Sequence, residues 1–124
     1  MMPVLRVMGM PMDVDQANLE RLLGSLQKAI CPHLGICPSE VSVFFPADLV
    51  SRGLGEELIC VVEGLFDKPE RAVAVRQRLA SSLASELARF AGNHLPQCNK
   101  VEVIVNRFDQ DTDGFATLNV QTPT

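Results

Sequence analysis

Aromatic residues are scarce in this chain: they make up 5% of its 124 residues, and there is no tryptophan or tyrosine. Since 47% of the residues are hydrophobic, aliphatic side chains are expected to fill the interior. Basic residues are also few, with 11 Lys and Arg against 15 Asp and Glu, so the net charge is −4 and the pI is near 5.1. This acidity argues against nucleic acid or an anionic membrane surface as the main partner.

Long hydrophobic runs are absent as well. No apolar run approaches the roughly 18 residues that are needed to span a bilayer. The first residues lack the charged and apolar regions of a signal peptide. We therefore expect a cytoplasmic protein with no membrane partner, and a length of 124 residues predicts a single domain over residues 1–124.

The cysteines show no disulfide-framework spacing. Cys60 lies inside an apolar run, where it is expected to be a small buried hydrophobic residue. The other three lie near the two histidines, which suggests a metal site, but the spacing matches none of the usual zinc patterns. We expect no metal and no cofactor, and keep as an alternative a metal-binding domain built on Cys31, His33, Cys37, His94 and Cys98.

Alternating or continuous apolar runs predict four strands. They cover Val4–Met8, Val41–Phe45, Leu58–Val62 (extended to Leu65) and Val101–Phe108. In the last of these, Val101, Val103 and Val105 would share one face, and Glu102, Ile104 and Asn106 the other.

Two helices are predicted between the strands. The first, capped by Asp13 or Asp15, has an apolar stripe at helical spacing and should end at the turn 31–38; the stripe is Leu19, Leu22, Leu23, Leu26 and Ile30. The second should begin near 67–70 and end at Gly92; its stripe is Ala72, Val75, Leu79, Leu83, Leu87 and Phe90. A turn over 109–114 and a short last strand, Phe115–Val120, would complete the chain.

The two halves of the chain resemble each other. His33-Leu-Gly-Ile-Cys37 precedes one valine strand, and His94-Leu-Pro-Gln-Cys98 precedes the other. Such self-similarity predicts an α/β (α+β) fold: a tandem β-α-β repeat, over about 3–46 and 57–108, in which a four-stranded mixed sheet carries two helices on one face. The other sheet face would then be bare, which predicts association of subunits, and the strand from Phe115 could pair with a neighbour's sheet edge.

Pro3 is the most unusual chemical feature of the sequence. If translation starts at Met2 and this methionine is removed, the nitrogen of Pro3 is a free secondary amine. A pocket of apolar residues would lower its pKa and leave a neutral base at working pH. If Met1 and Met2 are retained, the nitrogen is an amide and Pro3 only begins a strand.

The chain resembles the tautomerase superfamily, especially proteins like macrophage migration inhibitory factor and D-dopachrome tautomerase. Four stretches in order carry the resemblance: Met2-Pro3, Val41–Leu49 with the glycines after it, Leu58–Leu65, and Val103–Asp109 followed by Gly114-Phe115. The resemblance implies a homotrimer in which the terminal proline lies at a pocket between subunits and moves a proton between the enol and keto forms of an acid. It implies Pro3 as the catalytic base and Asn106, Ile104 and Leu65 as pocket residues.

The cations of this family are missing at their usual positions. Cys37-Pro38 stands where cytokine-like members have a lysine beside the proline, and Ser42 stands where short bacterial tautomerases have an arginine. Another arginine of these enzymes falls near Asp13. A substrate carboxylate would need other cations; the candidates are Arg6, Arg52, Arg107 and Lys68.

Two functions of different classes follow. The first is a homotrimeric tautomerase that acts on a small 2-keto or enol acid with Pro3 as general base. The second is a non-catalytic trimeric binding or scaffolding protein of the same fold, which the missing cations favour. Retention of Met2 would favour the second.

Overall fold

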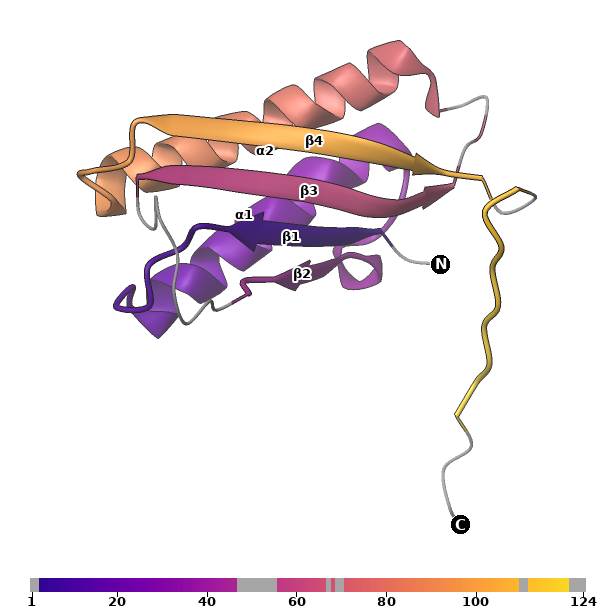
Figure 1. Cartoon of the computed structure of the whole chain (residues 1–124), viewed down its shortest axis with the longest axis horizontal. Helices are drawn as coiled ribbons and strands as arrows, with labels where there is room; N and C mark the ends of the chain where they lie inside the picture. The colour runs from indigo at the N-terminus through magenta and orange to yellow at the C-terminus, as the bar shows by residue number, and fades with distance from the viewer. Residues whose placement is uncertain (1–2, 47–55, 67, 69–70, 110–111, 121–124) are drawn as a thin grey trace.

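The computed structural model describes residues 3–46, 56–66, 68, 71–109 and 112–120. These residues form one four-stranded sheet with two helices behind it (Figure 1). The elements are β1 (Val4–Met8), α1 (Gln16–Leu34), the short 3-10 helix η1 (Pro38–Glu40), β2 (Ser42–Phe44), β3 (Glu57–Phe66), α2 (Val73–His94) and β4 (Lys100–Phe108).

The sheet has the strand order β2-β1-β3-β4. Strands β1 and β2 are parallel, β3 and β4 are parallel, and the central pair β1 and β3 is antiparallel. Each parallel pair is joined through one helix, so the tandem β-α-β repeat and the mixed sheet are confirmed. The two central strands come from different halves of the repeat.

The core lies between the sheet and the helices. Leu5 and Val7 of β1 and Leu58, Cys60 and Val62 of β3 are fully buried. They pack against aliphatic residues of the two helices, which are Leu22, Leu26, Ile30, Leu79, Leu83 and Leu87. The alternation expected for β4 is also confirmed, because Val101, Val103 and Val105 pack against this core while Ile104 is 47% exposed.

Helix α1 begins as expected and ends later than expected. Asp15 is its N-cap, and its carboxylate accepts a hydrogen bond from the N–H of Ala17 at 3.4 Å. The expected stop at the Cys31-Pro32 turn is wrong, since the helix runs through Pro32 to Leu34. It ends at Gly35, which has a left-handed φ of 65° and donates its N–H to the carbonyl of Cys31 at 2.9 Å.

Helix α2 also differs from its expected bounds. It begins at Val73 with Ala72 as N-cap, without a side-chain cap, rather than near 67–70. Of that expected start, 67 and 69–70 lie outside the described residues. The expected end at Gly92 is wrong: Gly92 does not have the positive φ of a helix-ending glycine, and the helix continues to His94.

The C-terminal segment leaves the body of the molecule after β4 (Figure 1). A turn follows β4, and in it the N–H of Asp113 donates to the carbonyl of Asp109 at 2.8 Å. The expected strand Phe115–Val120 is wrong: 114–120 have no regular structure, and Leu118 and Val120 are each 93% exposed. A strand needs an edge to pair with, and the described part of the chain places none beside this segment.

The described cysteines differ in burial, and this predicts a difference in reactivity. Burial raises the pKa of the Cys60 thiol from its ordinary 9.0 to about 12, whereas Cys37 is exposed. Because the thiolate is the reactive form, Ellman's reagent at about pH 8 is expected to modify Cys37 in the native protein and to leave Cys60 unmodified until the chain is unfolded. Labelling of Cys60 as fast as Cys37 in the native protein would contradict its burial.

The same pKa shift predicts how stability responds to alkaline pH. In the unfolded chain Cys60 ionises near 9.0, while in the folded chain it stays protonated to about 12. The unfolded state therefore binds fewer protons between these values, and the free energy of unfolding falls as the pH rises through them. Thermal unfolding of Cys60→Ala, compared with the original chain across this range, measures the contribution.

No helix in the described part of the chain combines the length and the hydrophobicity that a membrane span requires.

Candidate active site

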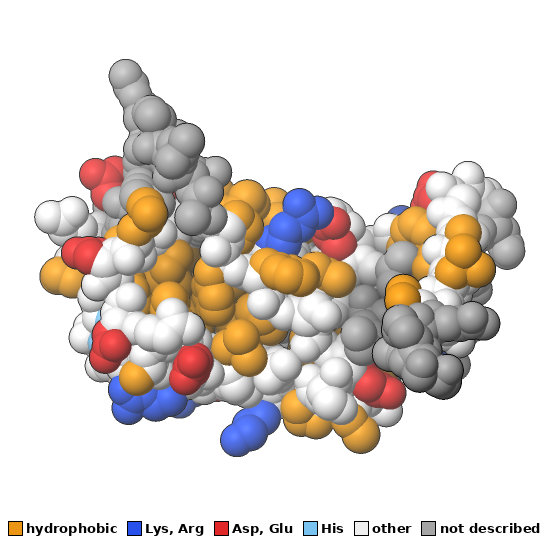
Figure 2. Space-filling model, turned by 90° about the horizontal axis from the view of Figure 1, so that it is seen from below, with side chains coloured by type: hydrophobic (Ala, Val, Ile, Leu, Met, Phe, Trp, Pro, Cys, Tyr) orange, Lys and Arg blue, Asp and Glu red, His pale blue; other side chains and the backbone are white. Residues whose placement is uncertain are grey.

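The sheet face turned away from the helices carries side chains that the fold leaves uncovered. Val4, Met8, Ile59 and Val61 are half-buried on this face, and Phe44 is 55% exposed. Figure 2 looks from below, onto the β2 edge of the sheet, where hydrophobic side chains reach the surface among scattered charged ones. An exposed apolar surface of this kind on a small protein indicates an interface or a ligand site.

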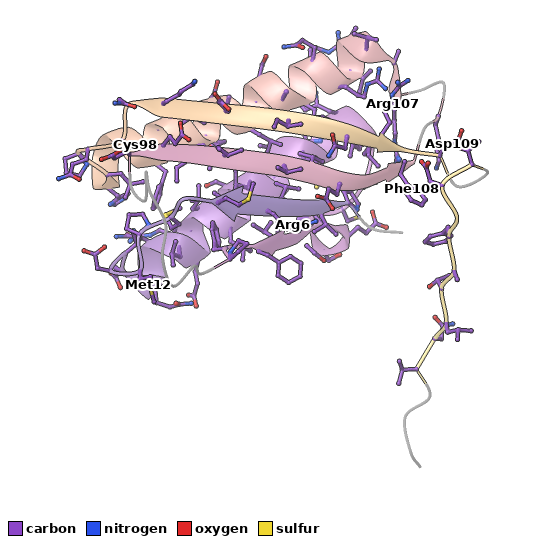
Figure 3. The ribbon with its side chains drawn as sticks, viewed as in Figure 1. Arg6, Met12, Cys98, Arg107, Phe108 and Asp109 are labelled. Atoms are coloured by element: carbon purple, nitrogen blue, oxygen red, sulfur yellow. The ribbon has the colours of Figure 1, made fainter. Side chains whose placement is uncertain are left out.

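One end of this face is hollowed into an open pocket of about 560 Å³, a volume typical of small-molecule sites. All four strands contribute to it. Its lining is Val4 and Arg6 from β1, Phe44 from β2, Glu63 and Gly64 from β3, and Asn106, Arg107 and Phe108 from β4. In the stick view, Arg6 lies along β1, and Arg107 and Phe108 lie at the end of β4 (Figure 3).

The two arginines of the pocket have different surroundings. Arg6 forms an ion pair with Glu63, with Nη2 and Oε2 2.5 Å apart. The strand register pairs Val4 with Glu63, so Arg6 reaches this carboxylate diagonally across β1 and β3. Arg107 is exposed and has no ion-pair partner in the part of the chain that the structure describes. It is therefore the pocket cation available to an anionic ligand.

A β-bulge in β3 shapes the pocket wall. The pairing of β3 with β4 shifts between Val62 and Leu65, and Glu63 and Gly64 of this bulge both line the pocket. The bulge also changes the face on which Leu65 lies. Regular alternation would place Leu65 with Val61 on the uncovered face, but the extra residue turns it into the core, where it is 1% exposed.

The residues expected at the site divide into three groups. Arg6, Asn106 and Arg107 meet in the pocket. Ile104 is on the same sheet face but is not part of the lining, and Leu65 is in the core. Arg52 lies outside the described residues.

Pro3 is buried directly before β1, and its carbonyl accepts a hydrogen bond from the N–H of Ser42 at 3.1 Å. It is next to Val4, the first lining residue, at the end of the sheet where β3 and β4 finish (Figure 1). Pro3 itself is not in the lining of the single chain.

The pocket lining also contains five residues that were not predicted from the sequence: Val4, Phe44, Glu63, Gly64 and Phe108. One signal was available. An isolated glycine within an apolar strand, as at Gly64, is typical of a bulge.

The histidines take part in helix packing. His33 Nε2 is 2.8 Å from the hydroxyl of Ser82, which links the two helices. The ring of His94 packs on Phe90, with centroids 4.7 Å apart. Among the described residues, no three His, Cys, Asp or Glu side chains are grouped so that they could hold a metal ion.

Neither a protein-family model nor a curated protein matches this sequence. Solved structures do match its fold. A fused 4-OT, an asymmetric trimer, has a TM-score of 0.67 and 14% identity over 90% of this chain and 91% of its own. Pt0534 inactivated by 2-oxo-3-pentynoate has a TM-score of 0.64 and 16% identity over 91% of each chain.

Macrophage migration inhibitory factor of Toxoplasma gondii has a TM-score of 0.60 and 16% identity over 93% of this chain and 94% of its own. These matches extend over nearly the whole length of both partners, although the identities are low. The resemblance that was inferred from the sequence is therefore confirmed at the level of the fold. The chain has the fold that the fused 4-OT, Pt0534 and macrophage migration inhibitory factor structures share.

Proposed function

We propose that this protein is a tautomerase that interconverts the keto and enol forms of a small 2-keto acid, with Pro3 as the general base. The position of Pro3 carries the proposal. Pro3 directly precedes β1 and is next to the lining residue Val4, at the end of the sheet where the pocket opens. In the proposed assembly a free secondary amine there would reach a ligand once a neighbouring subunit completes the site. The proposal requires that Met2 is removed.

In the proposed reaction, the amine of Pro3 accepts a proton from the carbon next to the ketone. The electron pair of that C–H bond forms the enol double bond, and the electrons of the C=O π bond move onto the ketone oxygen. The protonated Pro3 amine then gives its proton to this oxygen, which regenerates the base. Arg107 would pair with the substrate carboxylate, and the amide of Asn106 would donate a hydrogen bond to an oxygen of the substrate. The reverse sequence gives ketonisation.

A homotrimer is part of this proposal. The uncovered sheet face, the open pocket at its end and the exposed side chains of Leu118 and Val120 are surfaces that other subunits would cover. The matching fused 4-OT is a trimer. A neighbouring subunit would close the pocket over Pro3 and exclude water from it.

The alternative is a non-catalytic trimeric binding protein. The ion pair between Arg6 and Glu63 favours it, because one of the two pocket cations is already neutralised within the chain. Cys37 and Ser42 also stand where tautomerases have cations.

The deciding experiment combines intact mass with covalent labelling by 2-oxo-3-pentynoate, the compound that inactivates Pt0534. We expect a mature chain that starts at Pro3 and an adduct that peptide mapping places on Pro3, in a protein that is a trimer by native mass spectrometry. A chain that keeps Met2 and takes up no label would support the binding protein instead. A stable monomer would contradict the shared site.

The pocket arginines predict a difference in substrate binding. Arg107→Gln is expected to raise KM for phenylpyruvate about tenfold, because a charge-assisted hydrogen bond to the carboxylate is lost. The change in kcat should be small, since this contact is made in both ground and transition states. Steady-state kinetics measures both values, and Arg78→Gln, an exposed arginine of α2 outside the pocket, is the matched control. An unchanged KM in Arg107→Gln would exclude this residue as the carboxylate partner.

A further inference from the structure

A second, polar groove opens on the helical side of the molecule, between the first half of α1 and the last half of α2. It has a volume of about 170 Å³, which is smaller than a drug-sized site of roughly 300 Å³ or more. Leu22 and Phe90, 4% and 7% exposed, form its apolar floor. A groove of this size admits one small polar group.

The charged residues of the groove are mainly basic. Arg21 of α1 and Arg89 of α2 both line it, together with His94, and Glu86 is the acidic residue of the lining. This is a local excess of positive charge on a chain whose net charge is −4. Glu86 offsets the charge of Arg89, whereas Arg21 donates to a neutral amide, so the lining keeps a net positive charge that would attract an anion.

Each guanidinium is oriented by a contact on its own helix. Arg89 Nη2 donates to Glu86 at 2.7 Å, and Arg21 donates to the side-chain oxygen of Asn18. Each guanidinium has five N–H donors, so these contacts leave most of its donors free to bind a ligand. The two arginines are therefore partly pre-organised at the rim of the groove.

Neutral donors complete the groove. The hydroxyl of Ser25 comes from α1, and the amide of Asn93 comes from α2. The imidazole of His94 is held against the ring of Phe90, which keeps it at the wall. Two guanidiniums with hydroxyl, amide and imidazole donors suit a tetrahedral oxyanion better than a planar carboxylate, because they approach it from several directions.

We propose that the groove between α1 and α2 binds the phosphate group of a small ligand. Arg21 and Arg89 hold the charge from opposite helices, and Ser25, Asn93 and His94 donate to the remaining oxygens. The site is on the other side of the sheet from the pocket of Arg107, so the inference does not rest on the proposed tautomerase activity.

The test is an NMR titration of the full chain with inorganic phosphate and with glycerol 3-phosphate, at constant ionic strength, with acetate as the carboxylate control. We expect both phosphate compounds to shift the amide signals of Ser25, Phe90 and Asn93 and acetate to leave them in place. Arg21→Gln and Arg89→Gln should each weaken binding about five- to tenfold. Arg78→Gln, exposed on α2 outside the groove, should bind as the original chain does.

Three results would overturn the proposal: shifts spread over the whole surface, equal binding by acetate, or unchanged affinity in both groove variants. Both variants change exposed side chains, so we expect them to fold, and far-UV circular dichroism is the measurement that checks this. Equal affinity for the two phosphate compounds supports recognition of the phosphate group alone. Tighter binding of glycerol 3-phosphate supports a phosphate monoester as the ligand.

Discussion

Replacing Pro3 by alanine is expected to lower the rate of phenylpyruvate ketonisation about 10²- to 10⁴-fold. The variant keeps a terminal amine, but this amine is primary and is not held by a ring. A rigid base at the end of β1 presents its lone pair in one direction, and this orientation is lost with the ring. The hydrogen bond from Ser42 to the carbonyl of residue 3 is made by the backbone, so the strand pairing should survive the substitution.

The rate is measured by the loss of enol absorbance with purified mature protein. Pro96→Ala is the matched control, because Pro96 is exposed and precedes β4 at the opposite end of the strand from Arg107. This control should react at the original rate. A form that retains Met2 should be as slow as Pro3→Ala, since its nitrogen is an amide. Equal rates in all four proteins would remove Pro3 from the mechanism while leaving the fold assignment intact.

The order of the elements was predictable because hydrophobic periodicity reports which faces are buried. Leu5 and Val7, and Val101, Val103 and Val105, are in the core as the alternation predicts. Helix ends were less predictable, because they depend on which local group satisfies the last carbonyls. At α1 the left-handed Gly35 ends the helix three residues beyond Pro32.

The site was only partly predictable for a different reason. Arg6, Asn106 and Arg107 come from two strands that are about a hundred residues apart, and the family resemblance and charge were enough to select them. Strand register decides which side chains lie beside them, and so whether their charges are paired. Glu63 neutralises Arg6 because the antiparallel register of β1 and β3 brings the two side chains together. The hydrophobic periodicity of a single strand does not indicate how that strand is aligned with its neighbour.

Leu65 shows the same limit. It was expected in the pocket because the family resemblance implied an aliphatic pocket residue at this position. One extra residue in the ladder, at the bulge, is enough to turn it to the core. Glu63 lies on the uncovered face by regular alternation with Val61, and the bulge adds Gly64 to this face in place of Leu65, so the pocket has a glycine where an aliphatic side chain was expected.

Gly9→Ala is expected to destabilise the fold by about 2–4 kcal/mol. Gly9 follows β1 and has a φ of 91°, a conformation that L side chains rarely adopt and that costs about 1–3 kcal/mol. A Cβ at this position would also lie 2.3 Å from the carbonyl oxygen of Glu57, a backbone atom at the start of β3. Because the close atom belongs to the backbone of β3, the clash can be relieved only by a shift of β1 relative to β3.

Gly24→Ala is the matched control for this prediction. Gly24 lies inside α1, and an added Cβ would meet no atom within 4 Å. The same chemical change should therefore stabilise the protein, by up to about 1 kcal/mol. Denaturant unfolding of both variants gives the two free energies, and opposite signs are expected. If Gly9→Ala were as stable as the original chain, the close approach of Gly9 to the carbonyl oxygen of Glu57 would be contradicted.

The consequence of Gly9→Ala should reach the pocket. The close approach of Gly9 to Glu57 follows directly on the pairing of Met8 with Ile59, the last pair of the β1–β3 register. That register also brings Arg6 within reach of Glu63 at the pocket end of the same two strands. A shift of β1 at Gly9 should therefore perturb the Arg6–Glu63 ion pair, which starts from the residue three positions earlier in the chain. Loss of the ion pair in Gly9→Ala and its retention in Gly24→Ala, followed by NMR of the Arg6 side chain, is the expected result. An unchanged ion pair in a destabilised Gly9→Ala protein would show that the strain stays at Gly9 and is not transmitted along β1.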